Sequence, residues 1–347
     1  MRGLLLVILA MVSVGALASE PDHLPTPEQR RKAAEWNRNF RSTFSNLKWD
    51  VKKPFSEMEK SGYVAINGDD VYELPKLREA IAKNLPSDAT LVIYTSDKSD
   101  VQRLKDAYGA DLGDRLKFLI VPAGDNEIWG RDSLPFPVYM NSGNGLVDAI
   151  YPQGFEPDKA FAKAFSQPMQ ATQQYFRGGN LLFDFDGNCF TENANETADL
   201  NDPEGYFKSF YGCKTVTILD QQGGIGDIDE RVKFLGGKDV LTDNDSYAAI
   251  FKSKGYTVRK VPTTGAYYET YMNTLFVNGT IFVPQMGIAA DQPALDAYKQ
   301  EGWKVVGVYT KNLADRGHGN IHCVTMNFPP GSFAPSPLGA DFIQFAR

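Results

Sequence analysis

The chain has 347 residues, of which 42% are hydrophobic, and its 36 Lys and Arg against 43 Asp and Glu give a formal net charge of −7. This length is ample for a large core, and because no Pro/Ser-rich linker divides it, we expect a single domain over residues 19–347. A mildly acidic chain without a lysine- or arginine-rich stretch argues against nucleic acid as a partner, and its field weakly favours cations.

The first 18 residues have the pattern of a secretory signal peptide. Arg2 carries one positive charge, residues 3–14 are almost wholly apolar, and Ala16-Leu17-Ala18 forms an A-x-A cleavage site. The apolar run is too short for a membrane anchor. Cleavage after Ala18 would remove Arg2 and take the formal charge from −7 to −8. We therefore expect a secreted or periplasmic protein without a membrane partner after signal removal.

The predicted elements begin with helices and strands in alternation. Charged and aromatic residues at helical spacing predict an amphipathic helix from Pro27 to about Leu47. Residues before it, among them His23, are expected to form a loosely held start. Residues 91–94 then read as a buried strand, a helix follows from about residue 99 to 108, and residues 116–122 form a strand that stops at a proline.

Three later segments repeat the order helix, glycine, strand. Their glycines, Gly212, Gly255 and Gly302, lie 43 and 47 residues apart (255 − 212 and 302 − 255), each in the place of a helix C-cap. This period predicts a repeated α/β architecture, although a doubly wound sheet spaces its units in the same way. Hairpins between these units are expected to turn at Asp186-Gly187 and at Asn278-Gly279.

The three cysteines are Cys189, Cys213 and Cys323. In an oxidising compartment an odd count leaves one thiol over. Either Cys189 pairs with Cys213, or all three are unpaired, and the sequence does not choose between these alternatives. Cys323 follows a glycine-rich turn and enters a short apolar run. This position suits a nucleophile, while a buried core cysteine is the ordinary alternative.

Five loops carry polar residues that a core does not need, namely residues 128–133, 177–180, 226–234, 269–273 and the stretch around Cys323. Singly, each has an ordinary explanation as a surface ion pair, a turn or a helix cap. Together they supply a thiol, several carboxylates and a tryptophan. This set suits a planar cation, because carboxylates bind the N–H edges of a guanidinium, an aromatic face supports it and a thiolate attacks its central carbon.

The order of these motifs resembles the agmatine deiminase and Porphyromonas-type peptidylarginine deiminase family. The motifs are Trp-x-Arg-Asp, Gly-Gly-Asn, His-x-Asp (here Asp227-Ile228-Asp229), Tyr-x-Asn and Gly-Asn-Ile-His-Cys, and they run from about Trp129 to Pro329, over half of the chain. The resemblance implies a pentein fold, which is a pseudo-fivefold ring of α/β modules with the site at its centre. The helix–glycine–strand repeats agree with that expectation.

The resemblance also implies roles for single residues. Cys323 matches the nucleophile, which forms a covalent amidino intermediate and expels ammonia. Asp132 and Asp229 match the aspartates that hold the guanidinium nitrogens, so that neither a metal nor a cofactor is needed. The residues expected to line the substrate pocket are Trp129, Arg131, Gly178, Gly179, Asn180 and Asn273.

Asp227 departs from the family pattern, which has a histidine at this position as general acid and base. Burial and Asp229 would raise the pKa of this aspartate, while a bound cation would lower it. Three alternatives follow: Asp227 transfers the proton itself, His318 serves as a substitute acid/base, or the protein binds a guanidinium without turnover. His322 is expected to point away from Cys323, because side chains alternate along a strand.

We therefore expect an exported hydrolase of guanidino C–N bonds that gives a citrulline-type ureido product and ammonia. Export favours peptidyl-arginine as the substrate, although residues 147–167 contain no arginine that could anchor a substrate carboxylate. The alternatives are an agmatine deiminase, which converts agmatine to N-carbamoylputrescine, and a non-catalytic pentein that binds a guanidino small molecule, an arginine-containing peptide or a protein partner. A papain-like protease is disfavoured, because no histidine lies far downstream of Cys323.

Overall fold

The structure is a computed structural model that describes residues 22–40, 48–124 and 126–334. The predicted signal peptide lies outside these residues. The first helix is α1 (Pro27–Asn39), which begins with a capping box between Thr26 and Gln29. It is shorter than predicted, because Phe40 is already extended and stacks back on Trp36. The rest of that prediction, residues 41–47, is outside the described residues.

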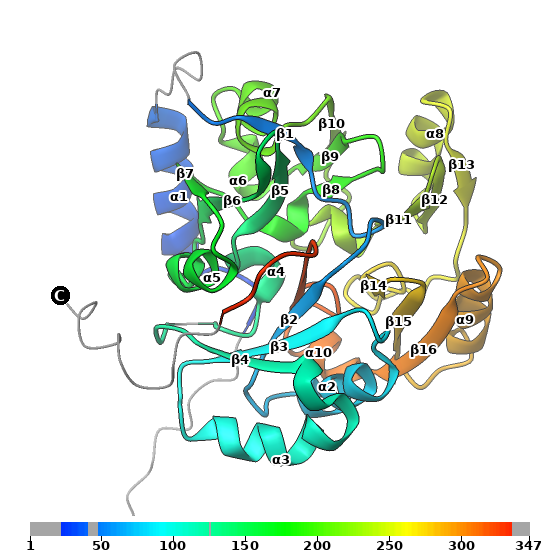
Figure 1. The fold of residues 1–347 in the computed structure, drawn as a ribbon. Helices are drawn as coiled ribbons and strands as arrows, with labels where there is room; N and C mark the ends of the chain where they lie inside the picture. The colour runs from blue at the N-terminus through cyan, green and yellow to red at the C-terminus, as the bar shows by residue number, and fades with distance from the viewer. Residues whose placement is uncertain (1–21, 41–47, 125, 335–347) are drawn as a thin grey trace, which may run out of the picture.

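Five small sheets surround a common centre (Figure 1). In the order of their hydrogen bonding, the strands of the first sheet are β1 (Val51–Pro54), β5 (Phe136–Met140), β6 (Gly143–Ile150) and β7 (Met169–Tyr175). The next three sheets are β10 (Thr215–Asp220), β9 (Asn188–Asn193) and β8 (Leu182–Phe183); β11 (Val232–Gly236), β12 (Asp239–Thr242) and β13 (Thr257–Arg259); and β14 (Leu275–Val277), β15 (Thr280–Gln285) and β16 (Lys304–Tyr309). The fifth sheet is β17 (Thr325–Phe328), β2 (Tyr63–Asn67), β3 (Thr90–Thr95) and β4 (Leu116–Ile120).

Every sheet contains the same three-stranded unit, in which one antiparallel pair is followed by one parallel pair. The parallel strands need a crossover, and helices supply it. These helices are α2 (Leu74–Asn84), α5 (Asp158–Phe165), α6 (Asn195–Ala198) with α7 (Pro203–Tyr206), α8 (Asp245–Ser253) and α9 (Asp291–Lys299). The fifth unit joins C-terminal β17 to N-terminal β2, so the two ends of the fold close the ring.

The remaining helical elements lie within the modules or between them. They are α3 (Asp100–Leu112), α4 (Gly130–Ser133), α10 (Lys311–Asp315), a π-helical turn (Phe207–Tyr211) and three 3₁₀ turns, η2 (Gly113–Arg115), η3 (Gly178–Asn180) and η5 (Ile228–Glu230). The glycines of the three repeats have positive φ, which satisfies the predicted caps. Both predicted hairpins also form, and the strand expected after Gly255 is the short β13.

The structure resolves the cysteine alternatives. Cys189 on β9 and Cys213 just before β10 form a disulfide, with a Cα–Cα distance of 5.6 Å. Because β9 and β10 are paired in parallel, this disulfide joins two neighbouring strand ends. Cys323 is left as a free, buried thiol.

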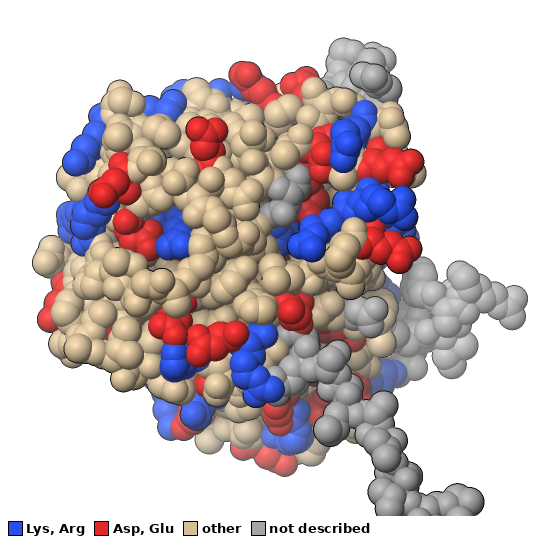
Figure 2. Space-filling model, turned by 180° about the vertical axis from the view of Figure 1, so that it is seen from behind, with Lys and Arg blue, Asp and Glu red and all other residues tan. Residues whose placement is uncertain are grey.

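On the face of the molecule seen in Figure 2, Lys and Arg side chains are interspersed with Asp and Glu side chains, so neither sign of charge dominates. Among the described residues, no helix is long and apolar enough to cross a membrane.

Candidate active site

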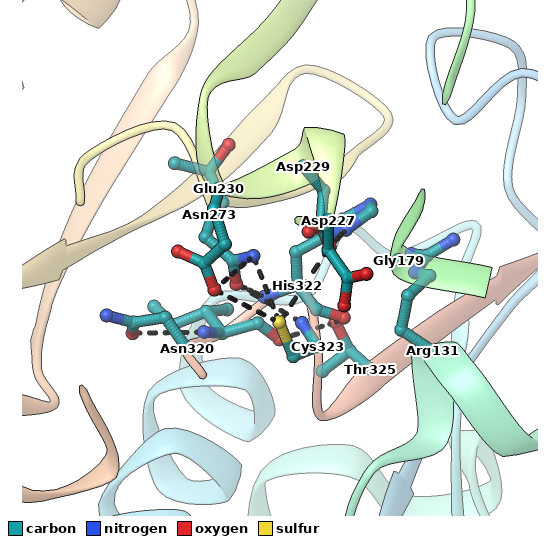
Figure 3. Close-up of polar contacts among 12 residues, drawn as sticks. Arg131, Gly179, Asp227, Asp229, Glu230, Asn273, Asn320, His322, Cys323 and Thr325 are labelled. Atoms are coloured by element: carbon teal, nitrogen blue, oxygen red, sulfur yellow. Dashed lines mark hydrogen bonds and ion pairs between the residues drawn. The ribbon is translucent and has the colours of Figure 1, made fainter. Parts of the chain in front are cut away.

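Short helical turns bring the site residues to the centre of the ring. Asp132 lies in α4, Gly179 in η3 and Asp229 in η5. Each of these turns comes just before the first strand of a three-stranded unit, and each unit belongs to a different sheet. Figure 3 shows the side chains of Asp229, Glu230 and Asn273 around the Cys323 sulfur. The polar groups therefore come together although they are far apart in the sequence.

Cys323 lies on a tight turn held by one asparagine. The Asn273 side-chain oxygen accepts hydrogen bonds from the backbone N–H groups of His322, at 2.8 Å, and Cys323, at 3.2 Å. Its amide nitrogen lies 3.1 Å from the Cys323 sulfur. From the other side, the Arg131 N–H donates to the Cys323 carbonyl at 2.9 Å. The sulfur is thus positioned mainly through backbone groups.

The expectation that His322 points away from Cys323 is wrong. The strand begins only at Thr325, and residues 321–324 form a turn, so strand alternation does not apply. The His322 Nδ1 lies 2.6 Å from Asp229 Oδ2, and this same carboxylate oxygen lies 3.8 Å from the Cys323 sulfur. His322 therefore orients the aspartate that is expected to bind a guanidinium nitrogen.

Glu230 is a site residue that the sequence interpretation did not select. Its Oε1 lies 3.5 Å from the Cys323 sulfur, and its side chain is fully buried. Burial, followed by Asp229, raises the pKa of Glu230 well above its ordinary value. The pKa of the Cys323 thiol is likewise raised by burial and then by Asp229 and Glu230, so the thiol of the ligand-free protein is protonated at neutral pH.

Three carboxylates, those of Asp132, Asp227 and Asp229, converge on Gly179. A Cβ at this glycine would lie 3.0, 3.2 and 3.3 Å from an oxygen of each in turn, so a side chain there would fill the space between them. The Gly179 N–H also donates to Asp132 at 2.7 Å. Gly178 is needed for a different reason, because its Cβ would lie 2.1 Å from the Arg131 carbonyl oxygen.

Asp227 is paired with a buried arginine. Its Oδ1 lies 3.0 Å from the Arg177 guanidinium, which also binds Glu196 at 3.1 Å. Burial raises the pKa of Asp227 well above its ordinary value; Arg177 opposes this shift, while Asp132 and Asp229 add to it. Asp227 is thus held, next to the Arg177 guanidinium, as a carboxyl group that takes up a proton readily.

His23 is fully buried in the site, so the expectation of a loosely held start is wrong for this residue. Its Nε2 donates to Asp132 Oδ2 at 2.5 Å and lies 3.6 Å from Asp227 Oδ2. Its ring packs on Trp129 with a centroid separation of 4.2 Å. Although burial opposes ionisation of Asp132, His23 and then Arg177 outweigh it and lower the pKa of that carboxyl group.

The other predicted pocket residues are placed differently. The Arg131 guanidinium turns toward β17, where it contacts Met326 and Asn327. The Asn180 amide is bound to Glu192 and Thr197 rather than aimed at the carboxylates. Both side chains are therefore placed to support the pocket walls.

His318 does not reach the catalytic groups in this arrangement. It bonds to Asp22 at 3.0 Å and packs near Tyr268, with about 30% of its side chain exposed. His318 therefore contacts the residue next to His23.

Among the described residues, three groups have the spacing of metal ligands; Asp148, Glu156 and Asp158 form one outside this site, and the other two lie inside it. These two are His23 with Asp132 and Asp227, and Asp229 with Glu230 and Cys323. The Arg177 guanidinium beside Asp227 disfavours a second cation in the first group. The second group includes the Cys323 thiol, and its two carboxylates would neutralise an organic cation as well as a metal ion.

The ring of five modules, with a thiol and several carboxylates at its centre, is a pentein fold, as the sequence predicted. C. jejuni agmatine deiminase has this fold, with a TM-score of 0.68 and 19% identity over 83% of this chain and 100% of that one. So does a putative arginine deiminase from Porphyromonas gingivalis, with a TM-score of 0.68 and 18% identity over 81% of this chain and 99% of that one.

Residues 68–329 match the Porphyromonas-type peptidyl-arginine deiminase family, and the chain belongs to this family. A putative agmatine deiminase of Marinomonas sp. (strain MWYL1) is 25% identical over 270 residues, which make up 76% of this chain. The chain spans 60% of the length of that relative. The predicted family is therefore confirmed.

Proposed function

We propose that the protein is an exported hydrolase of guanidino C–N bonds and that its substrate is arginine within a polypeptide. The observation that carries this proposal is the set of groups around Cys323. The buried carboxylates of Asp132 and Asp229 are the partners that a planar guanidinium requires, and the thiol lies 3.8 Å from the second of them.

The reaction follows from this arrangement in two steps. The Cys323 sulfur forms a bond to the central guanidino carbon, the bond from that carbon to one terminal nitrogen breaks, and the nitrogen leaves with an added proton as ammonia. Water then adds to the same carbon and the carbon–sulfur bond breaks. These steps give the ureido product and restore the thiol.

Substrate binding activates the thiol in this mechanism. A guanidinium between Asp132 and Asp229 brings a positive charge close to the sulfur and lowers the raised pKa of Cys323. Glu230 Oε1, 3.5 Å from the sulfur, accepts the thiol proton. The thiolate therefore forms only when a cation is present, which protects the empty enzyme from unwanted alkylation.

Asp227 carries the proton to the leaving ammonia and takes one from the attacking water. Its raised pKa suits a group that is protonated before the first step and ionised after it. Arg177 stabilises the ionised form. This role replaces that of the histidine expected from the family pattern.

Export and a polypeptide substrate have separate support. The signal-like residues 1–18 and the Cys189–Cys213 disulfide both fit an oxidising compartment. Arginine in extracellular peptides is the guanidine most widely available there, whereas agmatine belongs to the alternative function named above.

The test is citrulline or ureido release from arginine peptides, free arginine and agmatine, compared between the wild-type chain and Asp227→Asn and Asp227→His. We expect release from the peptide and a loss of about 10²–10⁴-fold in Asp227→Asn. A strong gain in Asp227→His would show that the aspartate impairs turnover. If the folded wild-type protein releases no product from any of the three substrates, the hydrolase proposal is wrong.

A second function, guanidinium binding without turnover, is favoured by one observation: the imidazole of His23 already holds Asp132. A guanidine-directed alkylating agent distinguishes the two functions. Rapid labelling of Cys323 supports hydrolysis, because it requires an activated thiol next to a bound guanidine. Reversible binding of the same compound without labelling supports the binding protein.

A further inference from the structure

The residues Asp22, His23 and Leu24, called here the entry segment, bend at the mouth of the site, where His23 contacts Asp132 and Gly317. The His23 N–H donates to the Gly317 carbonyl at 2.8 Å. The Gln153 side chain donates to the Asp22 carbonyl at 3.1 Å. Both contacts are made to backbone groups, which every polypeptide presents whatever its sequence.

The side chain of His23 takes the contacts expected for a guanidinium. It donates to Asp132 and covers Trp129, the carboxylate and the aromatic face that the sequence assigned to substrate binding. Gly319 leaves room for it, since a Cβ there would lie 2.5 Å from His23 Nδ1. This Nδ1 is buried and has no hydrogen-bond partner among the described residues. The His23 side chain therefore occupies the place expected for a guanidinium, but only one of its two ring nitrogens has a hydrogen-bond partner among the described residues.

With the entry segment in place, a substrate cannot enter. Cys323, Asp132 and Asp229 are at most 4% exposed. The two cavities that touch the site, one lined by Asp132 and one by His322, hold about 10 and 20 Å³. Each has room for about one water molecule, far less than a guanidinium needs. Binding therefore requires His23 to leave.

We propose that the mouth of the site is a polypeptide-binding site and that the entry segment occupies it as an internal pseudosubstrate, with His23 in the place of a substrate arginine. This inference rests on the proposed function and specifies its substrate. The contacts with Asp22 and His23 bind both polar groups of the single peptide bond that precedes the His23 Cα atom. A bound arginine would therefore be a residue that follows another in a polypeptide, and agmatine, which has no such peptide group, would lose these contacts.

The same contacts show how the pocket could hold an arginine residue although residues 147–167 contain no arginine to anchor a substrate carboxylate. They bind the peptide group before the residue and require no contact with a carboxylate after it. A backbone carbonyl needs only a neutral donor, and Gln153 supplies one. Gly317 supplies the acceptor for the peptide N–H.

The first experiment compares His23→Ala with the control Glu28→Ala, an exposed residue of α1, in full-length protein tagged at the C-terminus. Alkylation of Cys323 by a guanidine-directed alkylating agent, which brings its own cation, should be roughly tenfold faster or more in His23→Ala, because a competing internal ligand has been removed. Affinity for an arginine peptide should rise in parallel. Unchanged rates and affinity in His23→Ala would overturn the proposal.

The second experiment replaces His23 by arginine, which would turn the pseudosubstrate into a substrate. In His23→Arg we expect this residue to be converted to citrulline, detected by mass spectrometry, at a rate independent of protein concentration. The double variant His23→Arg/Cys323→Ala should show no conversion. Conversion that rises with protein concentration would mean that the segment is modified between molecules and is not seated in its own site.

These readouts separate the inference from the proposed function. If no variant releases citrulline but His23→Ala still binds the arginine peptide more tightly, the hydrolase fails and the internal pseudosubstrate stands. If His23→Ala instead loses turnover of every guanidine while alkylation of Cys323 is unchanged, His23 transfers protons in catalysis. That result would overturn its role as a pseudosubstrate.

Discussion

The two sides of the site are built in different ways. The cysteine side consists of Cys323, Asn273, Asp229, Glu230 and His322, and its sulfur is fixed by backbone contacts around one asparagine. The histidine side consists of Asp132, Asp227, Arg177, Trp129 and His23, and it is fixed by ion pairs that reach the N-terminal segment. The cysteine side carries the Tyr-x-Asn and Gly-Asn-Ile-His-Cys motifs, whereas the histidine side carries Asp227 at the position where the resemblance implies a histidine. Under the proposed function, the cysteine side supplies the nucleophile, and the histidine side supplies the proton transfer and controls access.

The cysteine side should be indispensable. Cys323→Ala removes the sulfur that forms the covalent intermediate, and turnover should fall by at least ~10³-fold. Thermal stability should change little, because only one buried atom is lost. The measurement is product release from an arginine peptide, with the melting temperature as control. Residual turnover within tenfold of wild type would place the nucleophile elsewhere.

The histidine side should contribute more to folding. Arg177→Met leaves the buried carboxylates of Asp227 and Glu196 without their cation, and the free energy of unfolding should fall by ~3–5 kcal/mol. Arg103→Met, which removes a partly exposed ion-pairing arginine, is the matched control and should cost less than about 1 kcal/mol. Urea denaturation measures both. If Arg177→Met and Arg103→Met lower the free energy of unfolding equally, the buried ion pairs of Arg177 do not stabilise the histidine side more than an exposed pair would.

Asn273 tests whether the cysteine side acts through positioning. Asn273→Ala removes the acceptor for two N–H groups of the nucleophile turn, and kcat should fall by ~10²-fold. Asn201→Ala is the control, since this asparagine also binds backbone groups but lies beside α1. Its kcat should match wild type. A larger effect on KM than on kcat in Asn273→Ala would contradict a role in holding the sulfur.

The smallest expected effect concerns the charge on the cysteine side. The negative charge of Glu230 raises the pKa of the Cys323 thiol, so Glu230→Gln should lower that pKa. The thiolate fraction at a given pH then rises, and the pH profile of Cys323 alkylation should move to lower pH. Glu204→Gln, at an exposed position, should leave the profile unchanged. A shift to higher pH in Glu230→Gln would contradict the electrostatic account.

The sequence predicted the fold well because the fold repeats. Glycines at regular spacing marked three of the helix–strand units, and the motifs that carry the family resemblance lie at the inner ends of the modules. Ring closure was not visible in any local pattern, because β17 pairs with β2 across almost the whole chain. The same long separation hid His23, which meets Asp132 109 positions away.

Other features of the site failed to show for local reasons. His322 was misplaced because the strand was assumed to begin before Thr325, and a turn of a few residues reverses the argument from alternation. Arg177 lies in one of the five polar loops, immediately before Gly178. Its partner Asp227 lies in another of these loops, at the position where the family pattern has a histidine. The opposite charges of Arg177 and Asp227 are the signal from which their ion pair could have been predicted.

The proposed hydrolysis is tested most directly by trapping its intermediate. The protein is mixed with an arginine peptide, quenched in acid and digested, and the peptide that contains Cys323 is weighed by mass spectrometry. The account predicts an adduct on Cys323 with the mass of the substrate minus ammonia, which is absent in Cys323→Ala. Citrulline release without any adduct on Cys323, or no adduct and no release even when His23→Ala opens the site, would contradict it.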